Sequence, residues 1–315
     1  MADTHASASR QSTCFAPGTV SNLGPGFDVL GLAIRGPGDT VTARLVPGTS
    51  VTISKVSGDQ GRLPLDASAN TAGIAAIETL RRAGVSAGIE LEIRKGMPLG
   101  SGLGSSAASA AAAALAVNIV VGSPLRRHDL VAAVVEAESA VAGRHGDNAA
   151  PAVLGGLILV RSVDPVDVLR LPVPEGLIVV VVTPAFELAT REARAVLPAA
   201  VPLRERTRNA ANIATFVSAC YSGEIGLLGA CIEDPVVTPA RAALIPGAVE
   251  VMLAARAAGC IGTSISGSGP TIFALCHAVP VANRVAAAMR EAFKRAGLDS
   301  HSVVSPADCP GAREV

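Results

Sequence analysis

Several short segments of the chain alternate apolar and polar residues, as half-buried strands do. Residues 40–46 and 51–55 alternate in this way and predict strands of an antiparallel sheet, and residues 88–94 predict another. Residues 176–183 are apolar without alternation, so we expect a central strand buried on both faces. Further strands are predicted at residues 14–17, 29–34, 155–161 and 271–276.

Other segments have the periodicity of helices. Residues 70–83 place alanine, isoleucine and leucine on one face, and Gly84 follows as a stop signal. Residues 282–296 are also amphipathic, and an alanine-rich run begins near residue 105. Because helices are interleaved with strands of antiparallel pattern, we predict an α+β fold in two lobes. Further helices are predicted at residues 130–141, 190–197, 204–221 and 247–258.

The length of 315 residues fits one large domain or two of ordinary size. Proline residues between 162 and 175 interrupt the pattern and indicate a boundary there. We therefore expect an N-terminal domain at 14–165 and a C-terminal domain at 166–306. The segments 1–13 and 307–315 are expected to be disordered tails.

Composition and charge exclude several classes of partner. Half of the residues are hydrophobic, mean hydropathy is +0.46, and 26 basic residues balance 26 acidic ones. The chain has no block of basic residues of the kind that binds nucleic acid or an anionic membrane. With no Trp and one Tyr, few side chains are available to stack on bases. Only three of the basic residues are lysines, Lys55, Lys95 and Lys294.

We expect a cytoplasmic protein with reduced thiols. The six cysteines are scattered without a C-x-x-C pair, and no histidine stands at zinc-ligand spacing from them. Residues 1–13 are polar and lack the apolar core of a secretory signal. The longest apolar run, near 107–121, is shorter than a membrane span and is interrupted by Asn118.

A glycine-serine loop at residues 98–106 leads directly into the alanine-rich helix. Gly100, Gly102 and Gly104 permit positive φ and close approach of a ligand, and Ser105 or Ser106 can cap the helix. Free N–H groups at the positive end of a helix dipole form an anion site, most often for phosphate. The alternative is a purely structural role, in which the loop is a flexible turn before a core helix.

The spacing of this loop excludes the two commonest nucleotide motifs. No Gly-Lys-Ser/Thr closes it as in a Walker A loop, and its glycines stand at alternate positions rather than in G-x-G-x-x-G. Two other segments, 17–28 and 264–270, are also rich in glycine and polar residues. Each of the three follows a predicted strand, so we expect them to converge on one polar cleft.

Three segments carry motifs of a known family. Residues 17–31 read PGTVSNLGPGFDVLG, residues 98–108 read PLGSGLGSSAA and residues 264–271 read SISGSGPT. In this order they resemble the motifs of the GHMP small-molecule kinases. The wording NLGPGFD, and DNAAP at residues 147–151, resembles the homoserine kinases within that superfamily. The resemblance covers nearly the whole chain, from about residue 14 to 276.

The resemblance implies a two-lobed GHMP kinase fold that binds ATP and Mg²⁺. Its N-terminal lobe would resemble the second domain of a small-subunit ribosomal protein, and its C-terminal lobe a ferredoxin. Ser106, or Ser105 beside it, would reach Mg²⁺ together with Glu138 or Glu136, of which we favour Glu138. An adenine contact at Asn70 is implied, although a helix N-cap explains that residue equally well. The implied nucleotide-binding residues are Asn70, Pro98, Leu99, Gly100, Ser101, Gly102, Leu103, Gly104, Ser105 and Ser106.

The resemblance also implies an acceptor site for L-homoserine, which has an ammonium, a carboxylate and a hydroxyl group. Asp28 would bind the ammonium, and Arg194 and Arg241 would hold the carboxylate. Asn148 is named to orient the hydroxyl, and Asp147 beside it is not assigned as a base. As catalytic residues we name Asn148 and Arg194. The further implied lining residues are Asn22, His145, Thr190 and Gly267.

Two other functions stay open from the sequence. One is a GHMP kinase for another small alcohol, such as mevalonate or a related amino acid. The other is a catalytically silent relative that binds the ligand as a sensor. A nucleotide-dependent oxidoreductase is disfavoured by the glycine spacing. Relatives of this kind suggest a homodimer.

Overall fold

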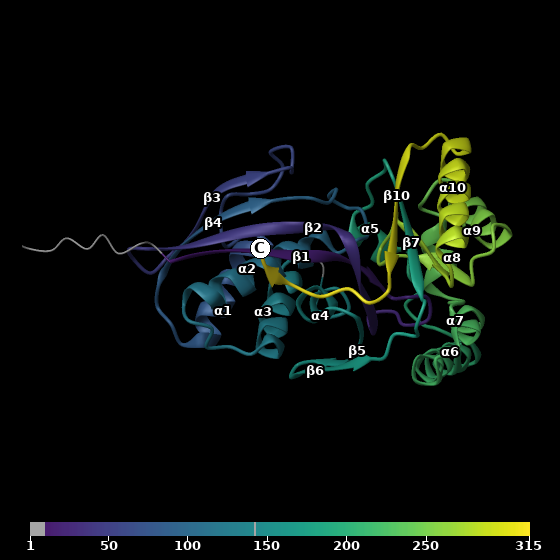
Figure 1. Cartoon of the computed structure of the whole chain (residues 1–315), viewed down its shortest axis with the longest axis horizontal. Helices are drawn as coiled ribbons and strands as arrows, with labels where there is room; N and C mark the ends of the chain where they lie inside the picture. The colour runs from purple at the N-terminus through teal and green to yellow at the C-terminus, as the bar shows by residue number, and fades with distance from the viewer. Residues whose placement is uncertain (1–9, 142) are drawn as a thin grey trace, which may run out of the picture.

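The computed structural model describes residues 10–141 and 143–315, which form two lobes, each around its own sheet (Figure 1). The predicted α+β class is confirmed. The strands are β1 (Gln11–Ser21), β2 (Leu30–Val46), β3 (Val51–Ser57), β4 (Gly88–Arg94), β5 (Leu157–Val163), β6 (Val166–Leu171), β7 (Ile178–Pro184), β8 (Gly262–Ile265), β9 (Ile272–Cys276), β10 (Ser300–Pro306) and β11 (Arg313–Glu314). The helices are α1 (Thr71–Ala83), α2 (Ser105–Val120), α3 (Arg127–Ser139), α4 (Ala149–Leu154), α5 (Thr190–Ala195), α6 (Leu203–Ser222), α7 (Ile225–Cys231), α8 (Val237–Ala242), α9 (Ala248–Ala257) and α10 (Val279–Arg295).

The first sheet is built around the long strand β2. Its strands follow the order β11-β1-β2-β4-β3, and β2 also pairs with β5, which pairs with β6. The two strands predicted at 29–34 and 40–46 are parts of β2. One prediction was wrong: β3 pairs with β4 in parallel, not antiparallel. Residue alternation reports which face is buried, whereas strand direction depends on a connection that runs through α1.

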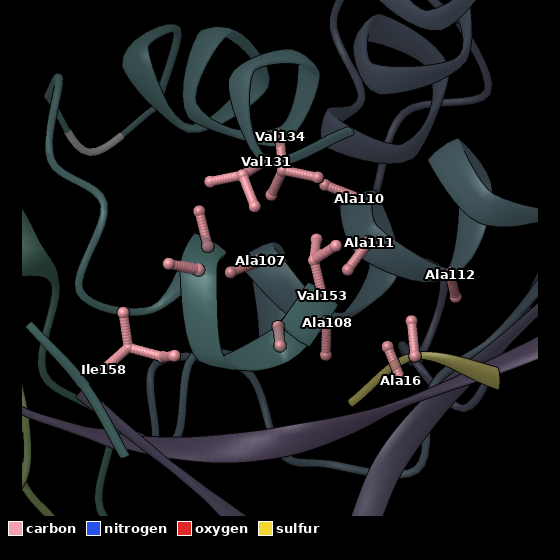
Figure 2. Packing of buried hydrophobic residues seen from close by; sticks show 14 of the residues in the cluster. Ala16, Ala107, Ala108, Ala110, Ala111, Ala112, Val131, Val134, Val153 and Ile158 are labelled. Atoms are coloured by element: carbon pink, nitrogen blue, oxygen red, sulfur yellow. The ribbon is translucent and has the colours of Figure 1, made fainter. Parts of the chain in front are cut away.

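Helix α2 is the centre of the first lobe. It is buried on nearly all sides, since α1 and α3 pack on it beside β1 and β2. Figure 1 shows α1 to α4 together on one side of the sheet. Figure 2 shows alanines of α2, such as Ala107 and Ala111, close to Val131 and Val134 of α3 and to Val153 of α4. Small side chains let these helices approach closely, so a larger residue here would overpack the core.

The second lobe has the ferredoxin-like order β10-β7-β9-β8, with α10 packed on β7, β9 and β10. Strand β7 is an inner strand, and all of its residues are buried. The predicted central strand at 176–183 is therefore confirmed.

The two sheets divide the chain between β6 and β7, after residue 171 and so later than the expected domain boundary at 165/166. Strand β6 pairs with β5 in a hairpin of the first sheet, so the expected boundary at 165/166 falls inside that hairpin. The expected tail at 307–315 is also ordered. It returns to the first lobe, where β11 pairs with β1 and Ala307, Cys309 and Ala312 are buried. Residues 11–13 belong to β1, and residues 1–9 lie outside the described part.

Within the described residues, no helix combines the length and the hydropathy needed to cross a membrane. The six cysteines are all free thiols, five of them buried and Cys260 partly so. Burial raises the pKa of several of these thiols, including Cys220 to about 12, so they are unreactive at neutral pH.

Candidate active site

The three glycine-rich segments converge as predicted, and they line a cavity of about 370 Å³. The Thr19 N–H donates to the Leu103 carbonyl at 2.9 Å, which joins the first segment to the second. Ser266 Oγ donates to the Gly102 carbonyl at 2.7 Å, which joins the third to the second. The Gly267 N–H donates to the Ser21 carbonyl at 3.1 Å and completes the set.

Most of the predicted site residues line this one cavity. Pro98 and Leu103 lie outside its lining: Pro98 is exposed, and the Leu103 side chain is buried in the core. The predicted residues in the lining are Asn22, Asp28, Asn70, Leu99, Gly100, Ser101, Gly102, Gly104, Ser105, Ser106, Glu138, His145, Asn148, Thr190, Arg194, Arg241 and Gly267.

The loop before α2 has the geometry of an anion site. Gly100, Gly102 and Gly104 all have positive φ, and Gly104 is the N-cap of α2. Serine capping was a wrong prediction: among the described residues no side chain caps this helix. Ser105 Oγ and Ser106 Oγ donate to carboxylates instead. The first N–H groups of α2 therefore have no hydrogen-bond partner within the helix. They lie at the positive end of the helix dipole, which borders the cavity.

Asn148 is held beside this loop by two hydroxyl groups. Its Oδ1 accepts from Thr19 Oγ1 at 2.7 Å, and its Nδ2 donates to Ser21 Oγ at 3.1 Å. A Cβ at Gly104 would stand 2.2 Å from Thr19 Oγ1 and 2.7 Å from Asn148 Oδ1. Only glycine permits the loop and the amide to approach this closely, and the amide orientation is fixed as a result.

A carboxylate from α3 faces the same helix end. Glu138 Oε2 accepts from Ser106 Oγ at 3.1 Å, and Oε1 is buried without a hydrogen-bond partner among the described residues. Burial raises the pKa of Glu138 to about 6, against the hydrogen bond from Ser106 and the charge of His145. Glu136 instead pairs with Arg144 at 3.3 Å and is 36 % exposed. The preference for Glu138 over Glu136 agrees with this arrangement.

Two arginines and an aspartate also line the cavity. Arg194 binds both carboxylate oxygens of Asp28, at 2.7 and 3.2 Å. The guanidinium carbons of Arg194 and Arg241 lie 5.4 and 5.2 Å from the centroid of the Phe27 ring. The aromatic ring attracts both cations.

Arg241 and Asn22 share one backbone acceptor. Arg241 Nη1 donates to the Gly267 carbonyl at 2.6 Å, and Asn22 Nδ2 donates to the same oxygen at 3.0 Å. Arg241 is buried, and desolvation, followed by the nearby Arg194 charge, lowers its pKa. Asn22 and Asp28 both have positive φ, a strained conformation for these residues that is often found at functional sites.

The remaining predicted residues are also placed by local contacts. Asn70 is the N-cap of α1, with Oδ1 accepting from the Ala72 N–H at 3.0 Å, so the capping alternative is confirmed. Thr190 begins α5, and its hydroxyl lies 3.4 Å from Ser268 Oγ. His145 Nδ1 lies 3.4 Å from Asp147 Oδ1, and both residues are buried.

Sequence reasoning missed a charged group under the loop. Lys95 lines the cavity and pairs with Asp39, which is buried in β2. Two signals in the sequence point to it: lysine is rare in this chain, and Lys95 comes just before the glycine loop.

Two family models match the chain: "GHMP kinases N terminal domain" over residues 70–156 and "GHMP kinases C terminal" over residues 216–295. The chain belongs to the GHMP kinase family. Within this family, it is 45 % identical over 309 residues to homoserine kinase from Arabidopsis thaliana. That alignment covers 96 % of this chain and 84 % of the relative. It is 43 % identical over 312 residues to homoserine kinase from Chlorobium phaeovibrioides, covering 95 % and 98 %.

A solved structure agrees with these relatives. The crystal structure of homoserine kinase from Cytophaga hutchinsonii matches this GHMP kinase with a TM-score of 0.94 and 41 % identity, over 98 % of both chains. The predicted two-lobed GHMP kinase fold and the predicted resemblance to homoserine kinases are confirmed.

Proposed function

We propose that this GHMP kinase transfers the γ-phosphoryl group of ATP to the side-chain hydroxyl of L-homoserine, with Mg²⁺, to give O-phospho-L-homoserine. One observation carries the proposal: a single cavity joins an anion-binding helix end to a charged triad of Asp28, Arg194 and Arg241. The relatives named homoserine kinase, at 41–45 % identity, support the choice of acceptor.

The nucleotide would bind at the end of the cavity formed by the glycine loop. The first N–H groups of α2 and the loop from Gly100 to Gly104 would donate to phosphate oxygens. Asn70 lines the same end and is already a helix cap, so an adenine contact there would use its remaining hydrogen-bonding capacity.

Glu138 and Ser106 fit a magnesium ion. Oε1 of Glu138, which has no hydrogen-bond partner within the described part of the chain, and the Ser106 hydroxyl are hard oxygen donors next to the N-terminus of α2. When bound, Mg²⁺ would neutralise charge on the phosphate oxygens. The two side chains hold each other in place through their hydrogen bond.

The acceptor would bind at the other end through its two charged groups. Its carboxylate would replace that of Asp28 on the guanidinium of Arg194, next to Arg241. Its ammonium would then pair with the released carboxylate of Asp28. Ligand atoms of Asp28, His145 and Asp147 lie within 4.8 Å of one another. The carboxylate of Asp147 would therefore also lie close to an ammonium bound by Asp28.

Asn148 would orient the acceptor hydroxyl toward the phosphate end. Its amide is fixed by Thr19 and Ser21 and borders the loop at Gly104. Phosphoryl transfer has a loose transition state, so alignment and charge neutralisation supply most of the catalysis. Asp147 is accordingly not assigned as a base. Thr190 and Gly267 would line the acceptor. The homodimer and the cytoplasmic location stay predictions from the sequence.

An acceptor panel tests the proposal. ADP release is measured with MgATP and L-homoserine, L-threonine, mevalonate or galactose, with Arg241→Ala as the matched variant. We expect turnover with L-homoserine, and a KM for L-homoserine that rises far more in Arg241→Ala than the KM for ATP. Activity with another alcohol alone would contradict the acceptor. Tight ATP binding without turnover of any alcohol would favour the silent sensor.

A further inference from the structure

Beneath the glycine loop, Asp39 of β2 and Lys95, which follows β4, form an ion pair whose side chains are 0 % and 2 % exposed. We infer that this pair positions the nucleotide site: it fixes both ends of the glycine loop at residues 98–106, and the lysine of the pair lies on the side of the cavity. The inference rests on the proposed function, because it assigns the pair to the ATP-binding end of that site.

Lys95 is fully engaged with protein acceptors. Besides the Asp39 carboxylate, its Nζ donates to the Ser105 carbonyl at 2.9 Å and to Ser109 Oγ at 2.7 Å. A lysine ammonium has three N–H donors, so these contacts use all of them. Lys95 therefore ties the first turns of α2 to the end of β4 instead of donating to a ligand.

Asp39 connects the two ends of the loop. Its Oδ1 accepts from the Gly96 N–H at 2.9 Å, where the chain enters the loop. Its Oδ2 accepts from Ser109 Oγ at 2.7 Å, in the helix where the chain leaves it. One carboxylate thus restrains both ends of a loop whose glycines would otherwise be mobile.

The pair is also oriented. Lys95, Ser105 and Ser109 belong to the cavity lining, whereas Asp39 lies behind them, outside the lining among the described residues. A buried pair with its cation toward the cavity adds positive potential to the N-terminus of α2. Either charge alone would be buried without compensation, which is strongly destabilising.

The test compares Asp39→Asn/Lys95→Met with each single variant. The double variant removes both buried charges, so we expect its Tm to recover much of what Lys95→Met loses. Its Kd for MgATP, measured by calorimetry on the full chain, is expected to rise about tenfold or more. Its KM for L-homoserine should stay near the wild-type value. If the pair had only a structural role, the double variant would change Tm but would not raise the Kd for MgATP selectively over the KM for L-homoserine.

A matched control lies on the same two strands. Arg44 of β2 and Glu92 of β4 pair at 2.8 Å on the surface, away from the cavity, so Arg44→Gln/Glu92→Gln should leave the Kd for MgATP unchanged. Ser109→Ala keeps the ion pair but removes the bridging hydroxyl, and it should raise that Kd by a smaller factor.

Each outcome decides the inference. A folded double variant with wild-type MgATP affinity would overturn it. If the double variant does not fold, an unchanged Kd in Ser109→Ala overturns it instead. A wild-type chain that binds MgATP but does not phosphorylate L-homoserine refutes the proposed acceptor and leaves the positioning role intact.

Discussion

Arg194 holds Asp28 through both terminal nitrogens of its guanidinium group, at 2.7 and 3.2 Å. The two side chains are 33 % and 32 % exposed, and a pair of that exposure contributes about 1 kcal/mol or less. In the proposed binding mode, a zwitterionic amino acid would therefore exchange into the pair at small cost, with its carboxylate on Arg194 and its ammonium on Asp28.

Asp28→Asn tests this exchange. Because the variant loses the negative charge that binds the ammonium, we expect the KM for L-homoserine to rise about tenfold or more. The ligand 4-hydroxybutanoate has the same hydroxyl and carboxylate but no ammonium. Its inhibition constant against L-homoserine should be nearly the same in the variant and the wild type. An equal loss for both ligands would mean that Asp28 acts only by holding Arg194.

Glu138 gives the protein a pH-dependent stability. Burial raises its pKa to about 6 from an ordinary value of 4.5, so the folded chain binds this proton more tightly than the unfolded chain. Above pH 6 the ionised carboxylate costs the fold about 2 kcal/mol, and this cost disappears as the pH falls to 4.5.

Glu138→Gln should therefore have a higher Tm than the wild type at neutral pH without Mg²⁺, with the difference vanishing near pH 4.5. Thermal unfolding at several pH values checks this. MgADP should stabilise the wild type more than the variant, because the amide is a poorer magnesium ligand. A Tm difference that does not change with pH would contradict the assignment.

Gly104 should be irreplaceable for both stability and activity. Gly104→Ala introduces a Cβ 2.2 Å from Thr19 Oγ1 at a φ of +64°, so we expect a loss of about 3 kcal/mol. Displacement of the loop and of Asn148 should lower kcat/KM for ATP about 100-fold.

Gly84 is the matched control for that substitution. It has a φ of +65°, with nothing within 4 Å of its would-be Cβ. Gly84→Ala should cost only the backbone strain, about 1 kcal/mol, and leave kinetics unchanged. Urea unfolding and steady-state kinetics on both variants separate the two effects. If Gly104→Ala and Gly84→Ala changed stability and kinetics equally, close packing around Gly104 would not matter.

Removing residues 307–315 should destabilise the first lobe. The segment buries Cys309 and Ala312, and the Ala312 carbonyl accepts from Arg127 Nη1. We expect a loss of about 3 kcal/mol in urea unfolding. Asp308→Asn, a change at a side chain 75 % exposed, should be neutral. A truncated chain as stable as the wild type would show that the segment is dispensable.

The local elements of this fold were predictable, whereas its long-range pairings were not. Helical periodicity marks α6 and α10 because every residue that defines it lies within the helix. The direction of β3 and the return of residues 307–315 depend on partners far away in the chain. The four-residue strand β8 and the six-residue helix α4 are too short to show a period.

The same division applies to the site. The motifs located the glycine loop and Asp28, because each motif is continuous in sequence, and the family resemblance implied both arginines. Serine capping failed because Glu138, 32 residues from Ser106, takes the hydroxyl. The Asp39–Lys95 pair joins residues 56 apart, and neither residue stands in a motif with the other. Contacts of this kind follow only from the folded sheet.

The most direct measurement is the ³¹P NMR spectrum of wild-type enzyme incubated with MgATP and L-homoserine. We expect a new phosphomonoester signal, split into a triplet by the two protons of the adjacent methylene group, that grows together with ADP. That splitting places the phosphate on the side-chain oxygen. Formation of only inorganic phosphate and ADP, or no change in the ATP signals, would show that the protein does not phosphorylate L-homoserine.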